Sequence, residues 1–134
     1  MRVFLDANVL FTAAHNPRGK AAFVIELGVA GHFLLFTSDA ALGEAETNLA
    51  VKYPHSLPFL KDLMSNINLL AADLSAPFIG GLPIKDAVIF QAAVSCHATH
   101  FLTGDLRHFG PFMNCPDATY SIIVQTVAEF LAAI

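Results

Sequence analysis

The segment LPIKDAVIFQAAVSCHATHFLTGDLRHF, residues 82–109, decides the fold of this chain. Pro83 suits the first turn of a helix, because a proline there loses no helical hydrogen bond. Between residues 87 and 94 only Gln91 is polar, so we predict a helix that is buried on most of its sides. Residues 100–103 read as a short strand.

Two acids lie at the ends of these predicted elements. Asp86 stands near the helix N-terminus, where a negative charge is favoured. Asp105 follows the strand, and Gly104-Asp105 predicts a tight turn. Because sites in α/β sheets form outside the carboxyl ends of the strands, we expect the two carboxylates to be neighbours.

Strands and helices alternate along the rest of the chain. We expect strands at residues 2–6, 32–37, 67–71, 100–103 and 121–124, and helices at 9–14, 20–30, 39–52, 56–65, 83–94 and 126–134. Ser38 is a suitable N-cap, and Thr126 and Glu129 have the spacing of a capping box. The alternation predicts an α/β fold, a three-layer sandwich with a five-stranded parallel sheet. At 134 residues we expect one domain, residues 1–134.

Composition excludes several classes of protein. Hydrophobic residues make up 55% of the chain and charged residues 13%, which excludes disorder and favours strands that are covered on both faces. The longest apolar stretch, residues 21–36, is interrupted by polar residues and glycines and is too short for a membrane helix. We see no signal-peptide pattern, and Cys96 and Cys115 have no metal-site spacing. We therefore expect a cytoplasmic protein with two free, buried cysteines.

The charge balance is unusual for a protein that binds nucleic acid. Eleven acids and seven lysines and arginines give a net charge of −4, whereas nucleic-acid binders are normally basic. If four acids are set aside as metal ligands, seven acids face seven bases. A polyanionic substrate would then be attracted by bound cations or by a partner chain.

Four acids fall where the predicted sheet would gather them: Asp6, Glu44, Asp86 and Asp105. Four adjacent carboxylates raise each other's pKa values, and a divalent cation removes that conflict. Mg²⁺ or Mn²⁺ prefers oxygen ligands and can activate water and stabilise a leaving oxygen in phosphodiester hydrolysis. Asn8 and Thr103 offer neutral oxygens that would orient ligands or waters.

Each of these residues also has a simpler interpretation. Asp6 and Asp105 are suitable turn residues, and Asp86 complements a helix dipole. Glu44 alone reads as a solvated helix acid, and Glu46 competes with it for the same role. Lys85 and Arg107 read as exposed bases, and His108 lies near the predicted site with no zinc-type spacing to another histidine. The prediction therefore depends on all four acids converging.

These residues give the chain a resemblance to the PIN-domain family, the fold of the VapC-type toxin ribonucleases. The matching segments are FLDANVLF (4–11), SDAALGEA (38–45), LPIKDAVIFQAA (82–93), FLTGDLRHFG (101–110) and IIVQTVAEFL (122–131). They span nearly the whole chain, and the TGDLRHFG segment is most similar to the toxin branch. Each segment is a weak signal, and their order along the chain makes the set specific.

The resemblance implies a Mg²⁺- or Mn²⁺-dependent endoribonuclease, in which Asp6, Glu44, Asp86 and Asp105 would be the catalytic and metal-binding residues. It implies an RNA substrate and, for a toxin, an antitoxin protein as partner. The family's second acid lies in a variable helix, so the choice of Glu44 over Glu46 follows its position relative to Ser38 and Leu42. The apolar character of the chain also predicts a homodimer.

Three other functions are alternatives to this interpretation. A PIN-like scaffold would bind a protein or RNA partner without cleaving anything, although the presence of all four acids argues against it. A haloacid-dehalogenase-like phosphatase needs a second Asp two residues after the nucleophile, and position 8 is Asn. A flap-type DNA nuclease shares the chemistry, but this chain is too short for the DNA-holding elements of that family.

Overall fold

The computed structural model describes residues 1–134, which form one five-stranded sheet flanked by seven α-helices. The strands are β1 (Arg2–Leu5), β2 (Leu34–Ser38), β3 (Asn68–Leu70), β4 (His100–Leu102) and β5 (Ile123–Gln125). The helices are α1 (Ala7–His15), α2 (Lys20–Val29), α3 (Asp39–Lys52), α4 (Leu57–Met64), α5 (Ile84–Ser95), α6 (Leu106–Phe109) and α7 (Val127–Ala133). None of these helices is long and apolar enough to cross a membrane.

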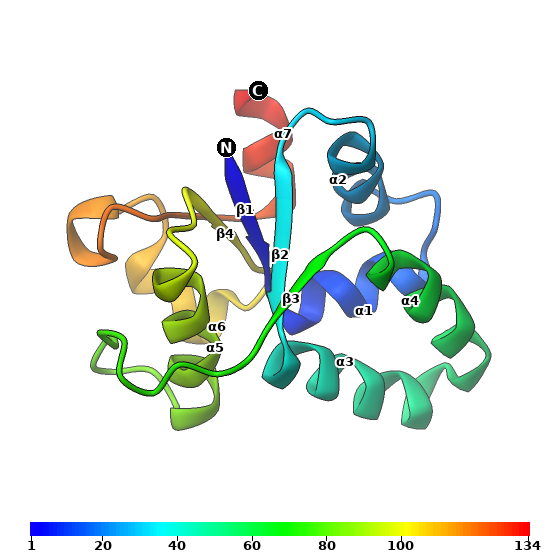
Figure 1. Ribbon diagram of the computed structural model, residues 1–134, viewed down its shortest axis with the longest axis horizontal. Coiled ribbons are helices and arrows are strands. Elements are labelled where there is room, and N and C mark those ends of the chain that lie inside the picture. The colour runs from blue at the N-terminus through cyan, green and yellow to red at the C-terminus, as the bar shows by residue number, and fades with distance from the viewer.

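All strand pairs are parallel, and the strand order is β3-β2-β1-β4-β5. The chain therefore builds the sheet outward from β1 in one direction and then returns to its other side with β4. Figure 1 shows α5 and α6 on one side of the sheet and α1, α2 and α4 on the other. The predicted α/β sandwich with a five-stranded parallel sheet is confirmed. Open sheets of this kind bind ligands where the strand order reverses, and here that point lies between β1 and β4.

Four fully buried phenylalanines fix the elements around this point. The ring of Phe101 on β4 stacks on Phe4 of β1, with centroids 5.4 Å apart. It also contacts Phe90 of α5 at 5.1 Å and Phe109 of α6 at 5.0 Å. Aromatic pairs at such distances contribute roughly 0.5–1.5 kcal/mol beyond their buried area. The cluster therefore holds α5 and α6, which carry or follow two of the predicted acids, against the central strands.

The sequence-based prediction differs from the structure in several places. Helix α6 was not predicted, since Gly104-Asp105 reads as a turn. In the structure the Asp105 side chain accepts a hydrogen bond from the His108 backbone N–H and so caps a one-turn helix. Helix α1 begins at Ala7, two residues before the predicted start, because the Asp6 side chain caps it. Both cysteines are free, but only Cys96 is buried; Cys115 is exposed, so its predicted burial is wrong.

Helix α2 packs closely on β2 at a glycine. A Cβ atom at Gly28 would lie 2.4 Å from Cδ1 and 2.6 Å from Cγ of the buried Leu35. By contrast, a Cβ at Gly43 in α3 would meet no atom within 4 Å. The two glycines are therefore matched helical positions with opposite surroundings.

We expect Gly28→Ala to lower the free energy of unfolding by about 1–2 kcal/mol. Overpacking costs roughly 1–3 kcal/mol, and the higher helix propensity of alanine offsets at most about 1 kcal/mol of it. Gly43→Ala should raise the free energy of unfolding by about 0.5–1 kcal/mol, because only the propensity gain remains. Urea denaturation of both variants measures the effects. A more stable Gly28→Ala protein would contradict the described packing of α2 on β2.

Candidate active site

Asp6 and Thr103 follow the two central strands and lie side by side. The register pairs Leu5 of β1 with Leu102 of β4, so the next residue on each strand stands at the same edge. The Asp6 backbone N–H donates to the Leu102 carbonyl at 3.0 Å, which continues the pairing past the strand ends. This edge is the point where the strand order reverses.

The carboxylate of Asp6 is buried and held by three hydrogen bonds. Its Oδ1 accepts from the Ala7 backbone N–H at 2.8 Å, which caps α1. Its Oδ2 accepts from the Thr103 hydroxyl at 2.7 Å and from the Asn8 amide at 3.1 Å. A carboxylate has about four lone-pair sites. The one left over is on Oδ1, so Asp6 can offer one oxygen to a further ligand.

Asn8 and Thr103 also fix the loop that follows β4. Asn8 Oδ1 accepts from the Gly104 backbone N–H at 2.6 Å, and Thr103 Oγ1 accepts from the Asp105 backbone N–H at 3.0 Å. A Cβ at Gly104 would lie 3.3 Å from Asn8 Oδ1, so a glycine allows this close approach. The two residues therefore position Asp6 and the loop; their predicted contact with a ligand or water stays a prediction.

His108 connects Asp86 and Asp105, the two acids of residues 82–109. Its Nδ1 lies 2.7 Å from Asp105 Oδ2 and 3.4 Å from Asp86 Oδ2. Ligand atoms of these three residues all lie within 4.8 Å of one another, a spacing that a metal ion could occupy. The sequence placed His108 near the site, and the structure places it in contact with two of its acids.

Glu44 reaches the site from α3, whose start is capped by the Ser38 hydroxyl accepting from the Ala41 N–H at 3.1 Å. Its carboxylate forms an ion pair with Lys85. Glu46, the competing residue, lines a different cavity between α3 and α4. The i, i+2 spacing of the two acids places them on different faces of the helix, and Glu44 is the one on the side of Asp6.

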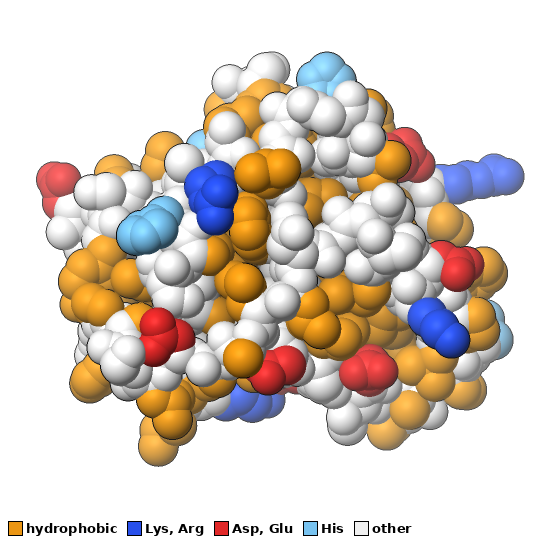
Figure 2. Space-filling model, viewed as in Figure 1, with side chains coloured by type: hydrophobic (Ala, Val, Ile, Leu, Met, Phe, Trp, Pro, Cys, Tyr) orange, Lys and Arg blue, Asp and Glu red, His pale blue; other side chains and the backbone are white.

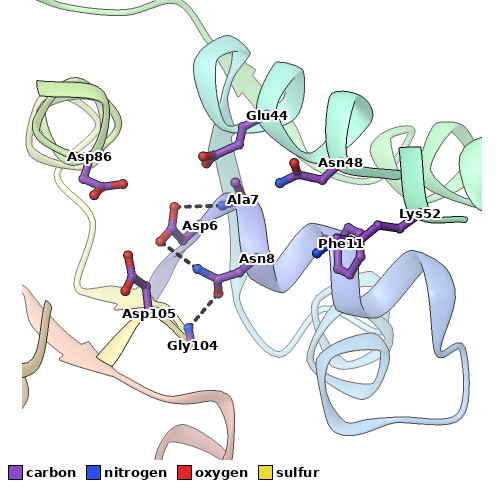
Figure 3. A pocket seen from close by; sticks show the side chains of 10 residues that line it. All are labelled: Asp6, Ala7, Asn8, Phe11, Glu44, Asn48, Lys52, Asp86, Gly104 and Asp105. Carbon is purple, nitrogen blue, oxygen red and sulfur yellow. Dashed lines mark hydrogen bonds between the residues drawn. The ribbon is translucent and has the colours of Figure 1, made fainter. Parts of the chain in front are cut away.

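The four acids line one cavity of about 310 Å³. Figure 3 shows Asp6, Asp86, Asp105 and Glu44 surrounding one end of it. The opposite end is lined by Phe11 of α1 and by Asn48 and Lys52 of α3. None of these three residues was predicted from the sequence to belong to the site. The signal for two of them was present, because Asn48 and Lys52 follow Glu44 at intervals of four and so share its helix face.

Burial raises the pKa of Asp6 from 3.8 to about 6. The hydrogen bonds from Thr103 and Ala7 lower this pKa and only partly offset the burial, while the charges of Asp86 and Glu44 raise it further. Burial and the nearby charge of Asp105 also raise the pKa of Asp86, against a smaller opposing effect of His108. Burial alone would raise the pKa of Asp105, but hydrogen bonds from the side chain and backbone of His108 lower it.

The donor set suits a hard divalent cation. It consists of carboxylate oxygens, it is open to the cavity, and it includes a buried acid whose ionised form is disfavoured in the absence of a positive charge. The compact group of possible ligand atoms contains Asp86, Asp105 and His108, and Asp6 and Glu44 line the same cavity outside that group. The arrangement can therefore bind a cation at the edge of the sheet, with room beside it for a substrate.

Two solved structures show the same fold. One is a chain of VapBC2 from Rickettsia felis bound to a DNA fragment from their promoter, with a TM-score of 0.69, 15% identity, and coverage of 94% of this chain and 98% of that chain. The other is a chain of VapBC-1 from nontypeable Haemophilus influenzae, with a TM-score of 0.61, 16% identity, and coverage of 96% and 99%. No protein-family model and no curated protein matches the sequence. At these identities the comparison concerns the fold, and the chain has the VapC-like PIN-domain fold.

Proposed function

We propose that this protein is a metal-dependent endoribonuclease that hydrolyses RNA phosphodiester bonds, and that it is the toxin of a toxin–antitoxin pair. The observation that supports the proposal most is the convergence of Asp6, Glu44, Asp86 and Asp105 on one cavity at the switch point of the sheet. The shared fold with chains of two VapBC assemblies supports an antitoxin as partner. The two free cysteines agree with a cytoplasmic protein.

Asp6, Glu44, Asp86 and Asp105 would hold Mg²⁺ or Mn²⁺. Such an ion supplies a hydroxide-like nucleophile from water and stabilises charge on the scissile phosphate. The chain's own contribution is positioning: Thr103 and Asn8 fix the Asp6 carboxylate, and His108 fixes that of Asp105. No side chain needs to form a covalent intermediate.

The alternative is a PIN-like scaffold that binds a partner and cleaves nothing. A scaffold has no reason to keep a buried acid with a raised pKa beside three other carboxylates, since that arrangement lowers stability. Calorimetric titration with Mn²⁺ separates the two functions. The nuclease should bind the ion, and the scaffold should show no binding heat.

We expect Asp6→Asn and Glu44→Gln each to reduce cleavage of single-stranded RNA more than about 100-fold, since removing even the outer partners of metal ligands costs roughly 10–100-fold. Glu46→Gln is the matched control on the same helix and should retain the wild-type rate. Cleavage of a labelled RNA in Mg²⁺ or Mn²⁺ measures this. The toxin role is tested by induced expression in cells: the wild type should arrest growth, and Asp6→Asn should not. An Asp6→Asn protein with the wild-type rate would refute the assignment.

The same substitution should stabilise the metal-free protein. Because the pKa of Asp6 is higher in the folded state than its ordinary value of 3.8, its ionisation opposes folding, and the cost grows as pH rises from about 4 to about 6. Above that range the cost is about 3 kcal/mol. Asp6→Asn removes this ionisation cost but also loses one hydrogen bond, which offsets about 1–1.5 kcal/mol of the gain in stability.

We therefore expect Asp6→Asn to raise the free energy of unfolding by about 1–2 kcal/mol near neutral pH and to lose this gain near pH 4. Asp105→Asn is the control with opposite sign: the pKa of Asp105 is lowered, so its ionised form contributes stability above the ordinary pKa, and the substitution should remove it. Urea denaturation in EDTA across this pH range measures both. Destabilisation by Asp6→Asn near neutral pH would contradict the described burial of Asp6.

We also propose that the protein is a homodimer. Phe78 and Ile84, with exposed fractions of 63% and 84%, lie beside an apolar cavity together with Leu74. Contiguous exposed apolar surface of this kind marks interaction sites in soluble proteins.

Light scattering after size exclusion should give twice the monomer mass for the wild type. Ile84→Gln should shift the equilibrium toward monomer without loss of stability, because the side chain at position 84 is almost fully exposed. A wild-type monomer at high concentration would refute the dimer. Lys61→Gln, on another exposed surface, should leave the mass unchanged.

A further inference from the structure

The cavity has a second end that the proposed reaction does not use. The four acids occupy one end, and Phe11, Asn48 and Lys52 line the other. Figure 3 shows these three side chains along α1 and α3, on the side of Asn8 and Glu44 away from Asp86 and Asp105. A site that only held a cation would need just the acidic end.

Two helix faces form the walls of this end. Glu44, Asn48 and Lys52 are spaced by four residues on α3, so they follow one another along about 12 Å of one face. On α1, Asn8 and Phe11 line the cavity, and His15 lies one turn further along the same face. The cavity therefore leads from the acids along the two helices toward their ends.

Three aromatic rings, those of Phe11, His15 and Tyr53, pack together at this end of the cavity. The Phe11 ring lies 5.2 Å from the His15 ring and 5.8 Å from the Tyr53 ring, measured between centroids. His15 and Tyr53 stack on each other at 4.6 Å with an interplanar angle of 10°. Phe11 is half-buried and faces the cavity, so its ring is held in place by aromatic neighbours while part of it stays accessible.

Lys52 is the basic residue that lines the cavity. Lys85 pairs with Glu44, and the remaining ion pairs involve His108, so Lys52 has no acidic partner. Its Nζ lies 5.8 Å from the Phe11 ring centroid. On the face shown in Figure 2, basic side chains stand apart from one another among apolar ones, with no broad basic patch. A single unpaired lysine at the end of the cavity therefore has a local effect on an anion.

We propose that this end of the cavity binds the nucleotide next to the scissile phosphate of single-stranded RNA. The base stacks on Phe11, the Asn48 amide hydrogen-bonds to the nucleotide, and Lys52 contacts the adjoining phosphate. Stacking on a fixed aromatic ring requires an unpaired base, which selects single strands over duplexes. This inference rests on the proposed nuclease function and names the substrate-binding residues of the same site.

The contacts of Lys52 and Phe11 also allow a role in stability alone, which the experiment must separate from a role in RNA binding. Lys52 lies in the last turn of α3, where a cation interacts favourably with the helix dipole, and its contact with Phe11 is a cation–π interaction. Both effects act on stability and leave the salt dependence of RNA binding unchanged. Salt dependence therefore separates the two roles.

The test measures binding of a fluorescein-labelled oligouridylate by anisotropy, in Mg²⁺, with Asp6→Asn as the parent protein to suppress cleavage. Phe11→Leu keeps apolar volume and loses the aromatic face, so binding should weaken about 5-fold or more. Lys52→Gln should weaken binding and reduce the slope of log Kd against log salt by about 0.7, the value for one phosphate contact on a single strand. Lys61→Gln, an exposed lysine on α4 outside this cavity, should match the parent.

In the protein with Asp6 intact, Lys52→Gln should raise KM for RNA cleavage and leave kcat unchanged. An unchanged salt slope in Lys52→Gln, or an equal loss in Lys61→Gln, would overturn the proposal while the nuclease function could still stand. If the wild type cut no RNA, the nuclease function would fail, and the anisotropy measurement would still decide whether this end binds a nucleotide. Because Asp6→Asn also removes a proposed metal ligand, a parent that binds no oligouridylate would overturn the proposal when Lys52→Gln also leaves KM unchanged in the protein with Asp6 intact; the aromatic end of the cavity would then suit a protein partner instead.

Discussion

The hydrogen bonds between Thr103, Asn8 and the Asp6 carboxylate connect the ends of the two central strands, and the geometry of the site depends on them. The Thr103 hydroxyl uses its full capacity: it donates to Asp6 and accepts from Asn8 and from the Asp105 N–H. The Thr103 hydroxyl thus fixes both the carboxylate of Asp6 and the backbone of Asp105. Buried networks of this kind specify a unique arrangement when every member is satisfied. Backbone pairing alone would align the strand ends and would leave the Asp6 carboxylate without these side-chain hydrogen bonds.

This network does not make the ionised Asp6 favourable, since its pKa stays well above the ordinary value despite three hydrogen bonds. The ionised Asp6 therefore lowers the free energy of unfolding, and burial of the apolar core must outweigh this loss. The fully buried rings of Phe4, Phe90, Phe101 and Phe109 pack together and connect β1, β4, α5 and α6, the elements that carry or flank three of the four acids. A well-packed core beside an electrostatically unfavourable group of acids is the arrangement expected where a functional site lowers the stability of a protein.

The sequence predicts those parts of the site that follow from strand ends and helix starts. Asp6 and Asp86 each belong to an apolar run that stops or starts at the acid, so a parallel sheet alone brings them to one edge. Glu44 was chosen over Glu46 by its position in the family resemblance; the residues themselves do not show which face of α3 borders the cavity, because that is set by tertiary packing. Helix α6 was missed because a capping Asp after glycine also describes a turn. Asn48 and Lys52 have ordinary side chains for an exposed helix, and only the position of α1 opposite them forms a cavity wall.

The placement of charge also explains how an acidic chain can be a candidate for RNA chemistry. The net charge of −4 equals the number of acids on the cavity, so the remaining charged residues balance. Long-range attraction to RNA is then absent from the metal-free chain, and any attraction must come from bound cations at one end of the cavity and Lys52 at the other. Affinity for a polyanion becomes coupled to cation binding, because each cation removes repulsion that would oppose the phosphate. If the proposed function holds, cation binding and substrate binding would therefore depend on the same four carboxylates.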